Sequence, residues 1–267
     1  MTMKTAEFTF LGTGTSQGVP MIGCHCEVCR SDNPKNKRLR TAGLIRYDGK
    51  AVAIDAGPNF REQMLSAGVD RLDAILLTHP HRDHIGGLDD VRPYNYYARY
   101  APPRPMPLYA TAHTLQGVKE NFPYAFEEHP YPGAPQFILN EIETNAAPFH
   151  VEGLSVQAIA IRHFQMDIAA FRIGDFCYIT DASEISAGSA DLIRGCRILV
   201  VNALRREPHP SHFTLDQAVA FIETIKPEQA YLTHIGHFME HEALCRELPI
   251  HIKPAYDGLT IAFNPAP

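Results

Sequence analysis

The chain has 267 residues, of which 45% are hydrophobic and 20% are charged, and its formal net charge is −6. This composition is typical of a globular protein, and the length allows one large domain with a substantial core. This negative net charge argues against a protein that binds long nucleic acid, because such proteins carry an excess of basic residues. No apolar run approaches the ~20 residues needed to span a bilayer, and the first residues lack the apolar region of a secretion signal. We therefore expect a cytoplasmic protein without a membrane partner.

The first part of the chain has the pattern of strands interrupted by one helix. Residues 7–14 predict a strand that runs into a glycine turn, and residues 43–57 predict a hairpin around an Asp-Gly turn pair. Residues 59–69 have helical spacing. Residues 72–79 begin with a short apolar run typical of a strand that is covered on both faces.

Residues 92–150 differ from the rest because they are rich in proline and tyrosine. We expect this segment to be an insertion that leaves the core, as a lid or wall over a site. Arg92, Tyr94, Tyr97 and Arg99 are its candidates for contact with a phosphate or sugar. Simple packing is the commoner role of a tyrosine-rich loop.

The second half of the chain returns to strands and helices. Strands are expected at residues 154–161, 168–174, 176–181, 197–204, 229–233 and 258–263, and helices at residues 214–225 and 240–248. Two strand-rich halves with helices outside them predict an α/β protein, a four-layer αββα sandwich. We predict that residues 1–267 form a single domain.

One turn, residues 78–84 (THPHRDH), carries four side chains that can bind metal ions. Zinc, manganese and iron ions accept imidazole nitrogen together with carboxylate oxygen. His79 and His81 can reach one ion if the end of the preceding strand stays extended. Asp83 and His84 follow after the chain turns and can reach a second ion nearby. The crowding therefore predicts one turn that serves two metals.

Each of these metals needs further ligands, and three candidates follow apolar strands elsewhere in the chain. His163, Asp181 and His234 each stand just past a predicted strand, where a sheet delivers side chains to one edge. We predict one metal on His79, His81 and His163, a second on Asp83, His84 and His234, and Asp181 bridging the pair through its two oxygens.

A cluster of cysteines lies nearer the N-terminus. Cys24, Cys26 and Cys29 fall within six residues, a spacing that in a cytosolic protein indicates a metal rather than a disulfide. A structural zinc has four ligands, and His237, three residues after His234, is available as the fourth. We predict a separate structural zinc that ties the N-terminal loop to the C-terminal half. A redox-active cysteine cluster and ordinary thiols are the alternatives.

The histidine turn and its three distant partners resemble the metallo-β-lactamase superfamily of binuclear hydrolases. The resemblance implies a metallo-β-lactamase fold, in agreement with the predicted sandwich. Asp181 stands where lactam-cleaving members carry a cysteine, which argues against antibiotic hydrolysis.

A second set of motifs is similar to the phosphoribosyl 1,2-cyclic phosphate phosphodiesterases of bacterial phosphonate breakdown. These motifs are the opening residues 11–20 (LGTGTSQGVP), the cysteine loop, the histidine turn, the histidine pair in residues 233–237 (THIGH) and the closing residues 256–258 (YDG). The coenzyme-PQQ biosynthesis B proteins also resemble the opening and the cysteine loop.

The resemblance implies a phosphodiesterase that opens cyclic phosphodiesters, of the phosphoribosyl 1,2-cyclic phosphate or 2′,3′-cyclic nucleotide type, with a metal-bridged hydroxide. The two catalytic metals are expected to be zinc or manganese. A histidine in the loop before residues 214–218 is implicated in catalysis in that family. His212 takes this place and is our candidate general acid, with His209 as the alternative. Asp83 is mainly a ligand that shares in proton transfer, and Asn202 stands where the family tends to have an acidic residue.

Other functions compete with this prediction. A tRNA 3′-processing endonuclease would need a basic arm, which the charge pattern does not provide. A thioesterase would leave the cysteine loop unexplained, and a carrier of the PQQ-associated kind would not need two open metals. The expected partner is a small anionic phosphodiester, and the family implies a possible homodimer.

Overall fold

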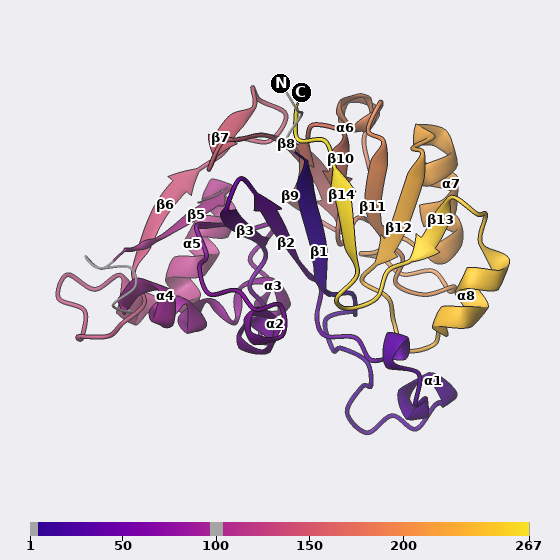
Figure 1. Ribbon diagram of the computed structural model, residues 1–267, viewed down its shortest axis with the longest axis horizontal. Helices are drawn as coiled ribbons and strands as arrows, with labels where there is room; N and C mark the ends of the chain where they lie inside the picture. The colour runs from indigo at the N-terminus through magenta and orange to yellow at the C-terminus, as the bar shows by residue number, and fades with distance from the viewer. Residues whose placement is uncertain (1–4, 97–103, 267) are drawn as a thin grey trace.

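Two β-sheets pack face to face at the centre of the molecule, and helices cover their outer faces (Figure 1). The computed structural model describes residues 5–96 and 104–266, and each sheet has seven strands within these ranges. The first sheet contains, from edge to edge, β14 (Thr260–Phe263), β1 (Ala6–Gly12), β2 (Ala42–Tyr47), β3 (Lys50–Ile54), β4 (Ala74–Leu76), β5 (Met106–Ala110) and β6 (Phe137–Glu141).

The second sheet is built from the later part of the chain. It contains, from edge to edge, β13 (Ile252–Pro254), β12 (Gln229–Thr233), β11 (Ile198–Asn202), β10 (Phe176–Tyr178), β9 (Met166–Ile173), β8 (Leu154–His163) and β7 (Phe149–Val151). The predicted four-layer αββα sandwich is confirmed by this arrangement.

The helices are short and lie outside the sheets. They are α1 (Glu27–Arg30), α2 (Phe60–Ser66), α3 (Arg82–Ile85), α4 (Arg92–Tyr96), α5 (Ala112–Asn121), α6 (Ala187–Ile193), α7 (Leu215–Ile225) and α8 (His241–Glu247), with 3₁₀ turns η1 (Pro34–Asn36), η2 (Leu88–Val91) and η4 (Pro123–Ala125). In the described part of the chain, no helix is both long enough and apolar enough to cross a bilayer.

Helix α7 shows why the sequence forms these elements where it does. Thr214 caps its first turn in a capping box with Gln217, so the free N–H groups of that turn find partners. Leu215 and Ile222 lie on one face and pack with Leu199 of β11. The helix predicted at residues 214–225 is therefore confirmed.

The layer between the two sheets is rich in aromatic side chains. Phe8 of β1 lies 4.7 Å from Phe176 and 5.5 Å from Tyr178 between ring centroids, and both partners belong to the second sheet. All three side chains are buried, and they share one core with Phe171 and Phe263. This apolar contact holds the two sheets in a fixed relation, and the functional loops emerge at the rim.

The expectation that residues 92–150 leave the core is wrong for much of that segment. β5 and β6 continue the first sheet in parallel beside β4, and Val118 of α5 is buried against that sheet. The sequence pattern did not predict these two strands, because each is short and flanked by turns in a segment rich in proline and tyrosine. Arg92 pairs with Asp89, and the Tyr94 hydroxyl donates to Val69 O at 2.8 Å. Tyr97 and Arg99 lie outside the described residues.

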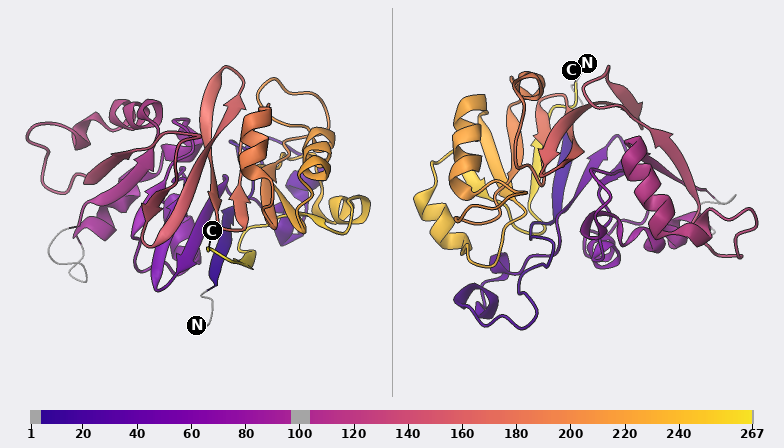
Figure 2. Two further views of the ribbon diagram at one scale, coloured as in Figure 1. Left: turned by 90° about the horizontal axis from the view of Figure 1, so that it is seen from above. Right: turned by 180° about the vertical axis from the view of Figure 1, so that it is seen from behind.

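Several strands deliver their carboxyl ends to the same edge of the sandwich. β3 and β4 run parallel in the first sheet, and β10, β11 and β12 run parallel in the second. β1 begins and β14 ends near the opposite edge (Figures 1 and 2). The residues that directly follow β3, β4, β10 and β12 are therefore neighbours in space although they are far apart in sequence.

Candidate metal centre

Three histidines meet where β4 and β8 end. His79 and His81 follow β4, and His163 is the last residue of β8. His79 Nε2 lies 3.1 Å from His81 Nδ1, and one ring nitrogen from each of the three residues lies within 4.8 Å of the others. His79 and His163 are buried, whereas His81 is exposed. The structure thus brings together the three residues predicted for the first metal.

A second group lies beside the first. Its members Asp83, His84, Asp181 and His234 also have ligand atoms within 4.8 Å of one another. The two oxygens of Asp181 face different partners: Oδ2 lies 3.3 Å from His84 Nε2, and Oδ1 lies 3.1 Å from His234 Nε2. Asp181 also groups with His163 of the first set. It therefore lies between the two groups, as its predicted bridging position requires.

The donor atoms of this cluster fit divalent cations. His84 Nε2, His212 Nδ1 and both ring nitrogens of His234 are buried, yet none makes a hydrogen bond to the described residues. Buried polar atoms without partners are costly, typically about 1–3 kcal/mol each. Imidazole nitrogens and carboxylate oxygens aimed at one point are the ligands that zinc and manganese accept. The seven predicted ligands are therefore better matched to metal coordination than to hydrogen bonding with one another.

Asp55, a buried residue that was not among the predicted site residues, supports the cluster through a hydrogen bond to His84. Asp55 Oδ2 accepts a hydrogen bond from His84 Nδ1 at 2.7 Å, and Thr78 N donates to Asp55 Oδ1 at 2.8 Å. Fixing Nδ1 leaves Nε2 of His84 directed into the cluster, toward Asp83 and Asp181. Asp55 directly follows the apolar strand β3, the same signal that selected His163, Asp181 and His234, so the sequence did contain the evidence.

The backbone is strained at three of these strand ends. Asp55, Asp181 and His234 have φ values of 65°, 58° and 54°, in the left-handed region that favours glycine. Such conformations cost of order 1–3 kcal/mol each and persist where the surroundings enforce them. Asn202 enforces one of them, because its side chain exchanges two hydrogen bonds with the backbone of Ala182, at 2.7 and 3.0 Å.

Charges within the cluster favour bound cations. Burial by itself raises the pKa of Asp181, but His234 and His84 outweigh it and hold that pKa well below its usual range. Burial lowers the pKa of His84, yet Asp181, Asp83 and Asp55 together raise it well above the ordinary histidine value. Three carboxylates thus surround His84, and this concentration of negative charge is what a pair of dications would neutralise.

The two candidate acids occupy different positions. His212 Nδ1 lies 3.6 Å from Asp181 Oδ1, and its ring stacks on that of His234 at 4.7 Å. Burial, together with the neighbouring His234, lowers the pKa of His212 to about 3, so its ring is neutral near pH 7. His209 lies further out, with its ring 5.1 Å from that of His212 and its Nδ1 bonded to Ser211.

The cysteine loop forms a separate cluster. Cys24 Sγ and Cys26 Sγ lie 3.2 and 3.5 Å from His237 Nδ1, and Cys29 completes a group whose ligand atoms lie within 4.8 Å of one another. Two ligands of a tetrahedral zinc are about 3.5 Å apart when zinc–ligand bonds are about 2.0–2.3 Å. Burial raises the pKa of Cys26, but hydrogen bonds from Cys29 N and His237 prevail and lower it to about 6. This thiolate character favours a metal.

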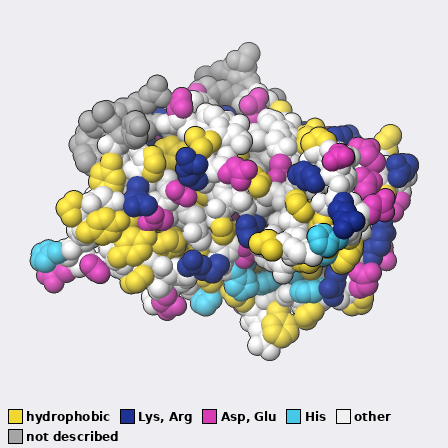
Figure 3. Space-filling view, turned by 90° about the horizontal axis from the view of Figure 1, so that it is seen from below, with side chains coloured by type: hydrophobic (Ala, Val, Ile, Leu, Met, Phe, Trp, Pro, Cys, Tyr) yellow, Lys and Arg dark blue, Asp and Glu magenta, His cyan; other side chains and the backbone are white. Residues whose placement is uncertain are grey.

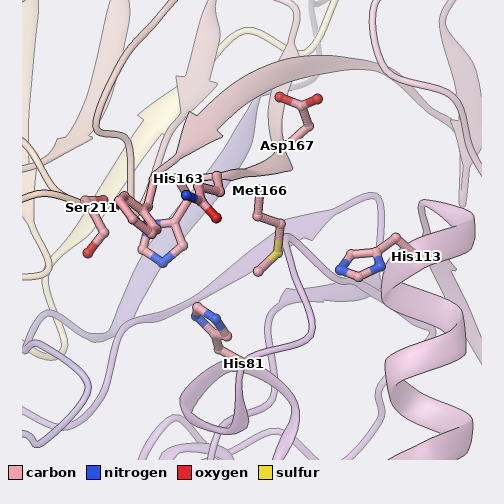
Figure 4. A pocket seen from close by; sticks show the side chains of 8 residues that line it. His81, His113, His163, Met166, Asp167 and Ser211 are labelled. Atoms are coloured by element: carbon pink, nitrogen blue, oxygen red, sulfur yellow. Dashed lines mark hydrogen bonds between the residues drawn. The ribbon is translucent and has the colours of Figure 1, made fainter.

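Two clefts open beside the cluster of histidines and carboxylates, on the face shown in Figure 3, where histidines form a band flanked by basic and apolar side chains. The larger, of about 620 Å³, reaches His81 and His163 and has His113 and Met166 in its walls (Figure 4). The smaller, of about 280 Å³, is lined by His212, His209 and Arg205 among others. The cluster is therefore accessible from two sides.

Comparison with known proteins places this geometry in a family. A sequence model of the β-lactamase superfamily domain matches residues 50–235. The chain belongs to the metallo-β-lactamase superfamily. A solved structure described as a new diphosphatase from the PhnP family superimposes with a TM-score of 0.90 and 41% identity, covering 97% of both chains. The predicted resemblance is confirmed, and this metallo-β-lactamase-fold protein is PhnP-like.

Other proteins similar to this superfamily member are named as a transferase, a ribonuclease and PqqB. An octanoyltransferase of Porphyromonas gingivalis is 42% identical over 252 residues, and the match covers 93% of this chain but 50% of that protein. The chain thus spans about half the length of that relative. A ribonuclease Z of Mycolicibacterium paratuberculosis is 25% identical over 215 residues, with 75% of this chain and 71% of that protein covered. Zinc-bound PqqB from Methylobacterium extorquens shares the fold, with a TM-score of 0.77, 20% identity and coverage of 96% and 99%.

Substitution of Asp55 by asparagine tests its support of the metal cluster. We expect Asp55→Asn to weaken metal binding about 10–100-fold, because a neutral amide holds the His84 ring less firmly. Competition with a chelator measures this affinity. Asp175→Asn is the matched control, since Asp175 pairs with Arg197 and directly precedes β10, at the end away from Asp181. Equal affinity in Asp55→Asn and the wild type would contradict the role.

Substitution of Cys29 by serine tests the cysteine loop. We expect Cys29→Ser to lose about one metal ion per chain and to unfold at a lower temperature, because a structural zinc needs all four ligands. Metal analysis and thermal unfolding give the two readouts. The control is Cys245→Ser on α8, an exposed cysteine outside the cluster. An unchanged metal content in Cys29→Ser would show that the loop holds thiols alone.

Proposed function

We propose that this metal-dependent hydrolase is a binuclear phosphodiesterase acting on small anionic diesters, including cyclic phosphodiesters. The observation that carries the proposal is the position of Asp181, which has one oxygen near His84 and the other near His234 and which also groups with His163. Divalent metals bound there would supply Lewis acidity, polarising phosphoryl oxygens and lowering the pKa of water from about 15.7 to about 7. Superfamily relatives named ribonuclease Z and diphosphatase support chemistry at phosphorus.

The chain's own residues would divide the remaining work. His79, His81 and His163 would hold one metal, and Asp83, His84 and His234 would hold the other, with Asp181 between them. Asp55 keeps His84 oriented, which limits the reorganisation needed during reaction. His212, which lines the smaller cleft and is neutral near pH 7, would donate an N–H hydrogen bond to the departing oxygen.

Hydrolysis of a diphosphate is the second candidate, because the PhnP-family structure at 41% identity is described as a diphosphatase. Both reactions place a phosphoryl group between metals and expel an oxygen leaving group, so the cluster alone does not separate them. A long tRNA substrate is disfavoured, because the net charge is −6 and the sequence has no lysine-rich run.

Metal stoichiometry and diester hydrolysis test the function directly. Metal-stripped protein is reloaded with zinc or manganese and assayed on bis-p-nitrophenyl phosphate, a 2′,3′-cyclic nucleotide and a dinucleoside diphosphate. We expect about three metals per chain, two at the cluster and one at the cysteine loop, with diester hydrolysis that appears on reloading. One zinc per chain with no hydrolysis would favour a carrier, and faster cleavage of the diphosphate would favour the second candidate.

Two histidine variants separate the candidate acids. We expect His212→Ala to lower turnover about 10²–10⁴-fold, the usual contribution of a positioned acid, while the metal content is unchanged. The matched variant His209→Ala lies on the same loop, and it should retain most of the turnover. A loss in His209→Ala with full rate in His212→Ala would reverse the assignment. Loss of metal in His212→Ala would make this residue a ligand instead.

A further inference from the structure

The larger cleft contains an aromatic side chain that neither folding nor metal binding explains. Phe164 directly follows the metal-ligand candidate His163 and lines this cleft together with Met166. It is 57% exposed, although phenylalanine is usually placed where its ring is covered. The apolar surface therefore lies open, one residue from the catalytic cluster.

The backbone at Phe164 is also strained. His163 pairs with Met166 across the β8–β9 hairpin, so Phe164 and Gln165 form the whole turn. Phe164 has a φ of 55°, a conformation that glycine and asparagine adopt readily and that a bulky residue rarely does. Its N–H donates to Ser183 Oγ at 2.9 Å, and Ser183 Oγ donates to Arg162 O at 3.0 Å. The turn is thus held firmly in an unfavourable conformation.

An exposed and strained aromatic residue beside a reactive centre points to binding rather than stability. A ring that packed for stability would be covered, and a turn selected for folding alone would carry glycine or asparagine. The rest of the cleft wall is partly polar. Gln165, Asp167 and His113 line it together with the apolar side chains of Phe164 and Met166. Figure 4 shows Asp167 and His113 on different sides of Met166.

We propose that Phe164 is the platform on which the base of a nucleotide substrate stacks, so that the substrate class is a nucleoside phosphodiester or diphosphate. This inference rests on the proposed hydrolysis at phosphorus and specifies which groups flank the phosphorus. A nucleoside carries a flat ring one sugar away from its phosphate, which matches a platform adjacent to the ligand His163. The polar edge of a base finds donors and acceptors in Gln165, Asp167 and His113, which line the cleft and to which an alkyl chain could make no hydrogen bond.

The smaller cleft supports the same substrate class. It reaches the cluster from the other side through His212, and it carries the cationic side chain of Arg205. A substrate with a base on one side of the phosphorus and a second anionic or sugar group on the other would use both clefts. The two rings that line the clefts at the cluster, His163 and His212, have centroids 4.9 Å apart.

The test compares substrates with and without a base in the metal-loaded protein. The base-bearing substrate is 2′,3′-cyclic adenosine monophosphate, and the base-free one is 5-phosphoribosyl 1,2-cyclic phosphate. Stacking of a base on an aromatic ring corresponds to about a 5- to 150-fold change in affinity. We expect Phe164→Ala to lower kcat/KM for the nucleotide by about this factor, mainly through KM, and by at least about fivefold more than for the base-free diester. Phe164→Tyr should retain most of the wild-type preference, because its ring also stacks.

A control variant and a stability measurement keep the outcomes distinct. Leu65→Ala truncates an apolar side chain that is 64% exposed on α2, and it should leave the substrate preference unchanged. Phe164→Gly relieves the backbone strain, so it should unfold at a temperature no lower than the wild type while losing the nucleotide preference. A lower unfolding temperature would show that Phe164 serves stability and would overturn the platform.

Different assay results would overturn the Phe164 platform and the proposed hydrolysis at phosphorus. If wild-type protein cleaves neither substrate nor bis-p-nitrophenyl phosphate, hydrolysis at phosphorus is wrong. If it cleaves both substrates, and Phe164→Ala reduces them equally or not at all, the platform alone is wrong. A preference for a long-chain alkyl phosphodiester over the nucleotide, lost in Phe164→Ala, would identify the cleft as a site for aliphatic groups and would also overturn the proposal.

Discussion

The structure depends on the burial of several imidazole and carboxylate groups close together at one rim of the sandwich. His84 and His234 are fully enclosed, and the nitrogens that they direct into the cluster make no hydrogen bond to the described residues. Asp55, Asp181 and His234 add backbone strain at the same place. Such an arrangement is unfavourable for folding, and the aromatic layer between the sheets must offset it. Divalent cations would turn this cost into coordination energy.

The two clusters of candidate metal ligands are joined by one short segment. After β12 ends, His234 turns into the catalytic cluster, and three residues later His237 meets Cys24 and Cys26. Ile235 N donates to Thr13 O between them, which attaches the segment to the end of β1. Figure 1 shows the cysteine loop around α1 beyond the edge of the sandwich. A metal at the cysteine loop would therefore stabilise the backbone that orients His234.

The hairpin that carries the ligand candidate His163 also carries Phe164, the residue that we propose for substrate recognition. Ser183 holds the Phe164 turn and lies two residues after Asp181, so the aromatic ring and the bridging carboxylate share one support. Asn202 fixes Ala182 between them. The sequence resemblance associates this position with an acidic residue, and here a neutral amide clamps the backbone instead. The ligand candidate Asp181 and the proposed platform Phe164 are thus supported by neighbouring residues of one loop, residues 181–183.

The sequence by itself determined the strand-rich sandwich, the cysteine loop and the seven catalytic ligand candidates, because local spacing identifies metal-binding side chains and strand ends. The same signal at Asp55 was overlooked, although it also follows an apolar strand. Tertiary structure alone decided that β5 and β6 extend the first sheet, that His212 faces Asp181 while His209 lies further out, and that Phe164 stays exposed. These features depend on which strands pair and where each side chain points after the chain turns, and short-range patterns of polarity do not contain that information.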